Sequence, residues 1–460
     1  MKDKLLNIYS KSPVWIQNMV CTFKGRIEKK SRLGGDFNKI YSDLLKSEYF
    51  DKEKIELYQY EKTKEILEYC NDNIPYYREL FEKINFDIKD FKSLKDLEKI
   101  PVLTKEIVRN NFKKLKNPNF EGKVVHSHTS GSTGKSLQFI FTVSAIQYRW
   151  ALWFRHKKRF GIKPEDSYAT FTGLPAVPLN QKKPPYWREN RAMKQTIFTM
   201  HHISNNTVES IVKRLNKGGF KYYSGYPSIL FSLANLIDEN NLEITNSPKV
   251  IFTGAEALLK YQRDKISEVF GCLVTDQYGF SEGCGNASRC EEDLFHEDFE
   301  YGVLECYDPK KNEDGSTTGT ILATGFTNLA MPFIRYQVGD TATWVDLDCS
   351  CGRKSKTIKE INGRNEDFVI TPEGNKILRF DYIFKDTLSI SESQIVQKEL
   401  GSIVIKIVER KGNNRSDVEK LLRKEIKNKI SRGLKVSFEY VSEIERSNTG
   451  KFRAVKSLIK

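Results

Sequence analysis

The most informative segment of the chain reads Thr129-Ser130-Gly131-Ser132-Thr133-Gly134-Lys135-Ser136. β-rich runs flank it, at 124–126 and 137–143. Its glycines allow a tight turn that points backbone N–H groups at an anion, while its hydroxyl groups and its lysine add hydrogen bonds and a positive charge. The composition predicts a loop that binds a polyphosphate, with a flexible Ser/Gly turn as the plainer interpretation.

The loop differs from the Walker phosphate loop in two ways. That motif needs a glycine five residues before Gly134, where this chain has Thr129, and it continues from its lysine into a helix. Here the residues after Lys135 have the composition of a strand. The Walker class of nucleotide-binding protein is therefore excluded.

Strand-like and helix-like segments alternate on the C-terminal side of the loop. The predicted strands are 168–171, 222–223, 250–252 and 273–275, and the predicted helices are 144–160, 207–216, 227–237 and 259–270. Alternation at this spacing indicates an α/β fold with a largely parallel sheet.

The two ends of the chain have a different character. Residues 1–100 are charged and helical, and we expect them to pack as a helical region on a large α/β domain at 101–362. The polar break Gly363-Arg364-Asn365-Glu366-Asp367 precedes a strand–helix–strand pattern that ends near 441. Residues 363–460 are therefore predicted to form a small C-terminal α+β domain.

Composition excludes several classes of protein. Of 460 residues, 39% are hydrophobic and 12% aromatic, which is enough for a large core and excludes a disordered chain. The net charge of +15 comes without a nucleic-acid-binding signature, so we expect no nucleic-acid partner. We find no apolar run of about 18 residues and no signal peptide, and we expect a cytoplasmic protein without a transmembrane segment.

More motifs follow the loop in a fixed order. They are Phe252-Thr253-Gly254-Ala255-Glu256, Tyr278-Gly279-Phe280-Ser281-Glu282, Arg335-Tyr336-Gln337-Val338-Gly339-Asp340, the break at 363–367 and Asn448-Thr449-Gly450-Lys451. Together with the loop they resemble the adenylate-forming (acyl-CoA synthetase-like) superfamily.

Shorter segments narrow this resemblance. Tyr76-Tyr77-Arg78, Pro101-Val102-Leu103-Thr104-Lys105, Tyr226-Pro227-Ser228 and Cys349-Ser350-Cys351-Gly352-Arg353 look like the phenylacetate–coenzyme A ligase family. The amino-terminal part, including Leu33-Gly34-Gly35, looks like the branch found as capsular polysaccharide biosynthesis proteins. Two departures, Glu366 in place of the usual aspartate and Gln337-Val338 in place of Arg-Thr, leave the acid substrate open.

The resemblance implies an ATP-dependent, AMP-forming carboxylate ligase. The large domain would bind ATP, Mg²⁺ and the acid, and the small domain would swing about Glu366-Asp367. An acyl-adenylate forms first, and the acyl group then passes to a thiol or amine acceptor, in capsular or surface polysaccharide biosynthesis. One alternative is an aryl acid–coenzyme A ligase, with coenzyme A as acceptor. The other is a nucleotide-binding homologue that has lost turnover.

The motifs supply the candidate site residues. We expect catalytic roles for Lys135, for Glu282 as a hard oxygen ligand of Mg²⁺, and for Lys451 as a cation delivered to the transition state. Tyr278 offers an aromatic face to adenine, and Asp340 can accept hydrogen bonds from the ribose hydroxyls. The remaining nucleotide-binding candidates are Thr129, Ser130, Gly131, Ser132, Thr133, Gly134, Gly254, Ala255, Glu256, Gly279, Ser281 and Arg364.

Four residues suggest a metal site. Cys290, His296, Cys349 and Cys351 offer three thiolates and one imidazole, a donor set typical of closed structural zinc sites. Some members of the resembled family carry a Cys/His site at matching positions. Cys284 is an alternative ligand, and reduced cysteines in loops are the plainer interpretation.

Two further features remain open. His126, His128, His201 and His202 are interpreted as substrate-pocket or core residues. An apolar stripe at Val14, Ile16, Met19 and Val20 lies close to Lys24, Arg26, Lys29 and Lys30. We expect this stripe to pack on the large domain, with peripheral membrane contact as the alternative.

Overall fold

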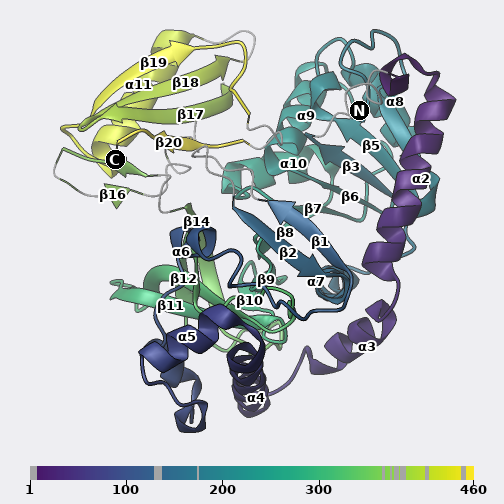
Figure 1. Ribbon diagram of the computed structural model, residues 1–460. Coiled ribbons are helices and arrows are strands. Elements are labelled where there is room, and N and C mark those ends of the chain that lie inside the picture. Colours follow the sequence, from purple (N-terminus) through teal and green to yellow (C-terminus); the bar gives the residue numbers. More distant parts are fainter. Residues whose placement is uncertain are drawn as a thin grey trace. The chain divides into compact units, whose positions relative to one another are not determined.

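The structure is a computed structural model (Figure 1) that describes residues 8–128, 137–173, 176–364, 368–372, 374, 376–377, 383, 390–409, 414–446 and 452–459. Two compact units divide the chain. The first comprises Met1–Gly25, Glu165–Asp276 and Asn362–Lys460, and the second comprises Arg26–Pro164 and Gln277–Ile361. The predicted division at residues 100 and 362 stays a prediction.

The first unit contains the predicted parallel sheet. Its strands are β3 (Tyr168–Thr172), β5 (Gln195–Thr199), β6 (Tyr222–Gly225), β7 (Val250–Thr253) and the start of β8 (Leu273–Gly279), with β4 (Trp187–Asn190) antiparallel to β5. The helices α8 (Val208–Lys217), α9 (Pro227–Glu239) and α10 (Lys260–Phe270) pack on this sheet (Figure 1). Pro227 begins α9, where its missing N–H costs nothing. The predicted α/β fold is confirmed.

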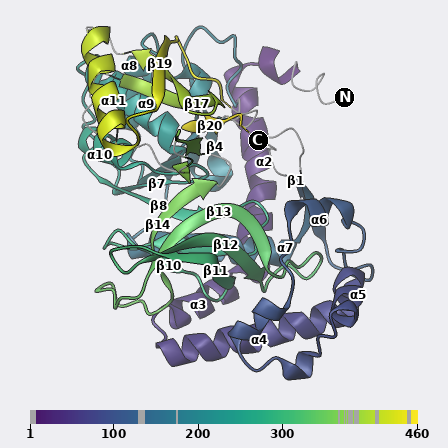
Figure 2. The same ribbon diagram turned by 90° about the vertical axis from the view of Figure 1, so that its left-hand side faces the viewer.

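The C-terminal part of the first unit has the predicted α+β pattern. The strands β19 (Lys435–Tyr440), β18 (Ser402–Glu409), β17 (Ile390–Glu399) and β20 (Val455–Ser457) form a sheet in this order, and α11 (Arg415–Lys429) lies against it (Figure 2). Ile395, Ile405 and Leu422 are fully buried between sheet and helix. A short ladder pairs β15 (Val369–Ile370) with β16 (Lys376–Ile377).

The second unit combines helices with antiparallel strands. Its helices include α3 (Phe37–Ser47), α4 (Lys52–Asn73), α5 (Pro75–Lys83), α6 (Lys105–Asn110) and α7 (Val143–Arg159). Its strands include β1 (Val124–His128), β2 (Gln138–Thr142), β9 (Asn286–Arg289), β10 (Phe295–Glu297), β11 (Gly302–Lys311), β12 (Thr317–Gly325), β13 (Tyr336–Val345) and most of β14 (Thr357–Arg364). The pairings β1–β2, β9–β10, β10–β14, β11–β12 and β12–β13 are all antiparallel, in contrast to the parallel pairings of the first unit.

The chain also contains short 3₁₀ turns and a further long helix. The turns are η1 (Ile88–Asp90), η2 (Leu94–Lys99), η3 (Arg191–Met193) and η4 (Met200–His202). The helix is α2 (Val14–Leu33), on which Met19 and Val20 are 62% and 48% exposed. Val14 and Ile16 of the same stripe are half-buried, so the expectation that the stripe packs on the large domain is wrong for Met19 and Val20. Among the described residues, no helix has the length and apolarity needed to cross a bilayer.

Candidate active site and candidate metal centre

Two predicted motifs are joined by hydrogen bonds in the second unit. Tyr278 at the end of β8 donates its hydroxyl to Asp340 Oδ2 at 2.8 Å. Tyr336 at the start of β13 donates its hydroxyl to Glu282 Oε1 at 2.6 Å. The 278–282 and 335–340 motifs, distant in sequence, therefore hold each other's carboxylates in place.

The protonation of both tyrosines suits this role. Burial raises the pKa of Tyr278 well above its usual value, and the Asp340 carboxylate adds to the rise. Burial and the Glu282 carboxylate raise the pKa of Tyr336 in the same way. Both hydroxyl groups therefore stay protonated and keep donating at neutral pH. Tyr336 was missed as a site residue, although it lies inside the 335–340 motif.

Arg335 has a supporting role beside these carboxylates. It adopts the left-handed conformation, with φ of 48°, and its guanidinium bonds to Glu305 Oε1 at 2.9 Å and to the Ile100 carbonyl at 2.6 Å. The Leu103 N–H donates to the Arg335 carbonyl at 3.0 Å. Arg335 thus attaches the Pro101–Lys105 segment to the strand that carries Asp340.

The Gly254-Ala255-Glu256 motif follows β7 in the first unit. Ala255 has a φ of 67°, so the chain turns sharply there. The Glu256 carboxylate accepts the backbone N–H of Ser228 at 3.2 Å and that of Phe452. Burial raises the pKa of Glu256, and these hydrogen bonds oppose the rise. Glu256 thereby holds the residue that directly follows Lys451.

Several predicted site residues are not described together with the Tyr278–Asp340 and Tyr336–Glu282 pairs. The predicted phosphate loop at 129–136, the predicted hinge at 365–367 and the lysine motif at 448–451 lie outside the described residues. Gly279 and Ser281 are exposed beside Tyr278, and Arg364 is the last residue of β14. Gly254, Ala255 and Glu256 belong to the first unit, whereas Tyr278, Glu282 and Asp340 belong to the second.

The histidines divide between core and surface. His202 is buried, its Nε2 lies 2.9 Å from the Pro178 carbonyl, and burial lowers its pKa. The expectation of a core residue is confirmed for His202. His126 and His201 are exposed, so neither is a core residue.

The predicted metal ligands converge within the second unit. The ligand atoms of Cys290, His296, Cys349 and Cys351 all lie within 4.8 Å of one another. Cys290 follows β9, His296 lies in β10, and the other two cysteines lie in the connection from β13 to β14. His296 is fully buried, and its Nδ1 lies 3.5 Å from Thr357 Oγ1.

The distances in this cluster fit a tetrahedral metal site. Cys290 Sγ and Cys349 Sγ are 3.8 Å apart, and Cys351 Sγ lies 3.4 Å from His296 Nε2. Zinc–sulfur bonds of about 2.3 Å put two sulfur ligands of a tetrahedron about 3.8 Å apart. A disulfide needs about 2.05 Å, and these cysteines are free. Cys284 is buried but is not part of the cluster.

A buried ionic network holds the two loops of this cluster. Asp298, two residues after His296, accepts from Arg353 at 2.9 Å and from Arg155 at 2.8 Å. Arg353 lies two residues after Cys351. Although burial opposes it, the two guanidinium groups lower the pKa of Asp298 to about 2. The ligand loops are therefore tied to one shared carboxylate.

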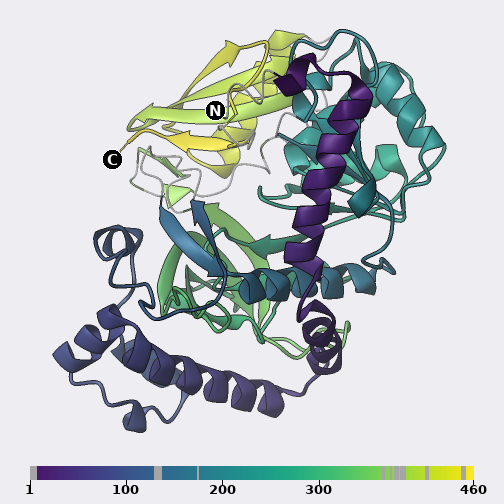
Figure 3. The same ribbon diagram turned by 45° about the vertical axis from the view of Figure 1, so that its right-hand side comes forward.

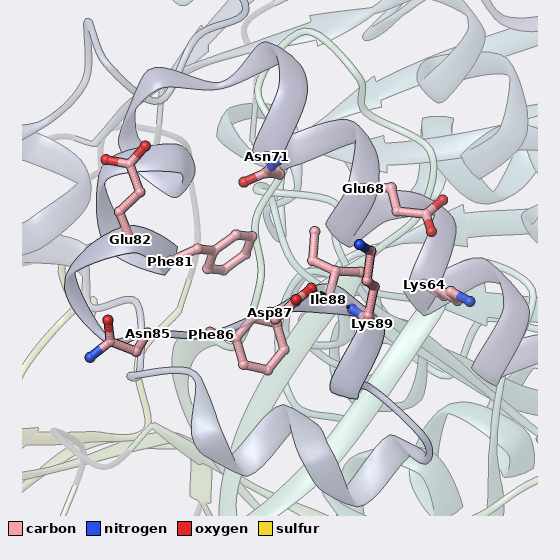
Figure 4. A pocket seen from close by; sticks show the side chains of 10 residues that line it. All are labelled: Lys64, Glu68, Asn71, Phe81, Glu82, Asn85, Phe86, Asp87, Ile88 and Lys89. Carbon is pink, nitrogen blue, oxygen red and sulfur yellow. Dashed lines mark hydrogen bonds between the residues drawn. The ribbon is translucent and has the colours of Figure 1, made fainter.

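A separate pocket lies among the helices that precede the phosphate loop (Figure 4). It has a volume of about 730 Å³ and lies between α4, the end of α5 and η1. Its lining residues are Lys64, Glu68, Asn71, Phe81, Glu82, Asn85, Phe86, Asp87, Ile88 and Lys89. None of them is a predicted site residue, so this pocket is distinct from the candidate active site.

The chain is similar in sequence to known proteins. Residues 369–458 match the family model of the CapK C-terminal domain. Protein CapK of Staphylococcus aureus is 28% identical over 460 residues, which covers 98% of this chain and 99% of that protein. The chain is similar to CapK over nearly its whole length. The phenylacetate-coenzyme A ligase of Thermus thermophilus is 25% identical, over 90% of this chain and 98% of that enzyme.

Solved structures agree on the fold. A 2-hydroxyisobutyryl-CoA ligase in the postadenylation state superposes with a TM-score of 0.68 at 18% identity, over 89% of this chain and 91% of that one. At this identity the likeness shows that the chain shares the fold of that ligase. The resemblance inferred from the ordered motifs is confirmed.

Proposed function

We propose that this protein is an ATP-dependent, AMP-forming ligase. It activates a carboxylic acid as an acyl-adenylate with release of pyrophosphate, and it transfers the acyl group to an acceptor. Its relationship to phenylacetate-coenzyme A ligases supports the reaction class. The alternative of a homologue without turnover is disfavoured because Lys135, Glu282, Asp340 and Lys451 are all retained.

One observation carries the proposal: the paired hydrogen bonds Tyr278–Asp340 and Tyr336–Glu282. They join an aromatic face and two carboxylates into one rigid group. A carboxylate fixed beside an aromatic ring suits a ribose and its base. A second carboxylate, held through one oxygen, suits a hard cation such as Mg²⁺.

The remaining roles follow from charge. Activation brings the anionic acid to the α-phosphate of an anionic nucleotide, so positive groups must converge there. Lys135 and the hydroxyl-rich loop before it serve the phosphates, and Ser281 serves the α-phosphate. Lys451 serves the transition state of adenylation, and Glu256 holds the chain beside it through Phe452.

The acceptor is either a thiol or an amine. The similarity to phenylacetate-coenzyme A ligases favours coenzyme A, a thiol, as the acceptor. The similarity to CapK favours a role in capsular polysaccharide biosynthesis, with a sugar amine as a suitable acceptor.

We also infer that Cys290, His296, Cys349 and Cys351 hold a structural zinc ion. The four protein donors fill a tetrahedron, so the ion would leave no position for substrate. Its contribution would be to fix the loop after β9 against the connection from β13 to β14.

Nucleotide binding is the first test of the candidate site. Asp340→Ala should weaken AMP binding in calorimetry by about tenfold or more, because it removes a charge-assisted hydrogen bond. Asp346→Ala removes an aspartate that is exposed after the same strand, so AMP binding should be unchanged. Equal AMP affinity of the wild-type protein and Asp340→Ala would contradict the assignment.

A further inference from the structure

Helix α2 turns a polar face toward the protein. The buried Gln17 accepts a hydrogen bond from Arg188 Nε at 2.6 Å. Asn18 Oδ1 accepts the backbone N–H of Glu189 at 2.9 Å. Because Arg188 and Glu189 lie in β4, polar side chains attach this helix to an edge strand of the parallel sheet.

The contact is close and continues along the helix. Thr22 Oγ1 accepts the Arg191 N–H at 3.2 Å. Gly25 is buried, and a Cβ there would lie 2.0 Å from the Asn190 side chain. The polar face of α2 is therefore fitted to the protein, and the orientation of the helix about its axis is fixed.

The opposite face of α2 is apolar and exposed. Trp15, Met19, Phe23 and Ile27 recur every fourth residue, and their exposed fractions are 63%, 62%, 66% and 59%. This spacing places the four side chains in one stripe. Figure 3 shows α2 as one straight purple helix. Surface helices of globular proteins usually bury their apolar face. Helix α2 does the opposite, because it buries its polar face and exposes its apolar stripe. An exposed apolar stripe of this kind marks an interaction surface.

Positive charge adjoins this stripe. The C-terminal half of α2 contains five basic residues and one acidic residue. The basic residues are Lys24, Arg26, Lys29, Lys30 and Arg32. The acid, Glu28, is paired with Arg32 at 3.1 Å. An apolar stripe with a basic end is complementary to a surface that is apolar inside and anionic outside.

We propose that α2 docks the protein on an anionic lipid bilayer. Trp15, Met19 and Phe23 enter the boundary between headgroups and acyl chains, and the exposed Arg26, Lys29 and Lys30 contact lipid phosphates. The charge pattern favours an anionic bilayer over a second copy of this chain. Anionic lipids supply the charge opposite to the basic half of α2, whereas a second α2 supplies none, because its basic half repels this one and its N-terminal half, residues 14–23, is uncharged.

Vesicle co-sedimentation of the full-length protein tests this proposal. The wild-type protein should bind mixed phosphatidylglycerol–phosphatidylcholine vesicles, and bind them less at high salt. It should bind phosphatidylcholine vesicles weakly. The double variant Trp15→Ser, Phe23→Ser should lose about tenfold or more in partitioning to the mixed vesicles, because it removes the two aromatic anchors.

A matched control is the double variant Leu57→Ser, Leu400→Ser, which changes two exposed leucines elsewhere. It should bind like the wild-type protein, and both double variants should keep the wild-type melting temperature. Absence of wild-type binding to the mixed vesicles, or equal binding by the Trp15/Phe23 variant, would overturn the proposal. A wild-type dimer that this variant converts to a monomer, without vesicle binding, would identify a second copy of the chain as the occupant.

Discussion

Two tyrosine hydroxyls organise the candidate nucleotide site at the scale of single residues. Tyr278 holds Asp340, and Tyr336 holds Glu282. Glu282 is only 6% exposed, so its bond to Tyr336 compensates part of the cost of burying a carboxylate. Removing such a donor leaves the acceptor unsatisfied, which costs more than the net strength of the bond.

Tyr336→Phe should therefore lower the free energy of unfolding by about 1.5–3 kcal/mol. It should also raise the Mg²⁺ concentration needed for half-maximal activity, because Glu282 loses its fixed orientation. Denaturant unfolding and a Mg²⁺ titration measure the two effects. Tyr440→Phe removes a hydroxyl that bonds to Glu419 at 3.3 Å near the surface, and should change neither quantity. If Tyr336→Phe has the wild-type free energy of unfolding, the Tyr336–Glu282 hydrogen bond does not stabilise the fold.

At the scale of elements, the cysteine–histidine cluster joins loops that are far apart in the sequence. Cys290 follows β9, whereas Cys349 and Cys351 precede β14. An ion pair between Arg353 and Asp298 links the segment that precedes β14 to the residue that follows β10. A metal ion would add its binding free energy to the folded state, because the unfolded chain has no preformed site.

Protein purified without a histidine tag should contain about one zinc ion per chain, because four donors fill one tetrahedral site. Cys349→Ser should lose the metal and lower the melting temperature. Elemental analysis and thermal unfolding measure these effects. Cys306→Ser changes a free cysteine outside the cluster and should keep the zinc. If Cys349→Ser retains both metal content and melting temperature, the zinc assignment is wrong.

At the scale of the whole molecule, much of the architecture could be predicted from local patterns. The strand at 250–252 and the helix at 227–237 are present as β7 and α9. A short apolar run of β-branched and aromatic residues indicates the strand, and a proline at the first position of a longer apolar segment indicates the helix. The antiparallel strands β11 and β12 were not predicted, since they carry no helix between them to mark the alternation. The outward apolar face of α2 was not predicted either, because periodicity does not reveal which face packs.

The candidate site was predicted in part. The motifs named Tyr278, Glu282 and Asp340, and the cysteine spacing named the four residues of the cluster. The Tyr336–Glu282 bond could not be inferred, because it depends on β13 passing beside the segment that follows β8. Contacts between distant segments follow from strand order and register, which local composition does not encode.

If the small domain swings, as the resemblance implies, Lys451 serves only one of the two half-reactions. Lys451→Ala should slow adenylate formation by about 10²–10³, the usual effect of losing one electrostatic contact to a transition state. Transfer from preformed acyl-adenylate should stay near normal. Lys435→Ala changes an exposed lysine in β19 and should affect neither step. Equal loss in both half-reactions would contradict the swinging-domain account.

The most direct test of the account is acid-dependent exchange of pyrophosphate into ATP. The wild-type protein should catalyse this exchange with at least one acid from a panel of aryl, fatty, amino and sugar acids, because acyl-adenylate formation is reversible. Asp340→Ala should reduce the exchange by about 10² or more, whereas Asp346→Ala should not. Absence of exchange with every acid, together with absence of ATP and AMP binding in calorimetry, would contradict the assignment as an adenylate-forming ligase.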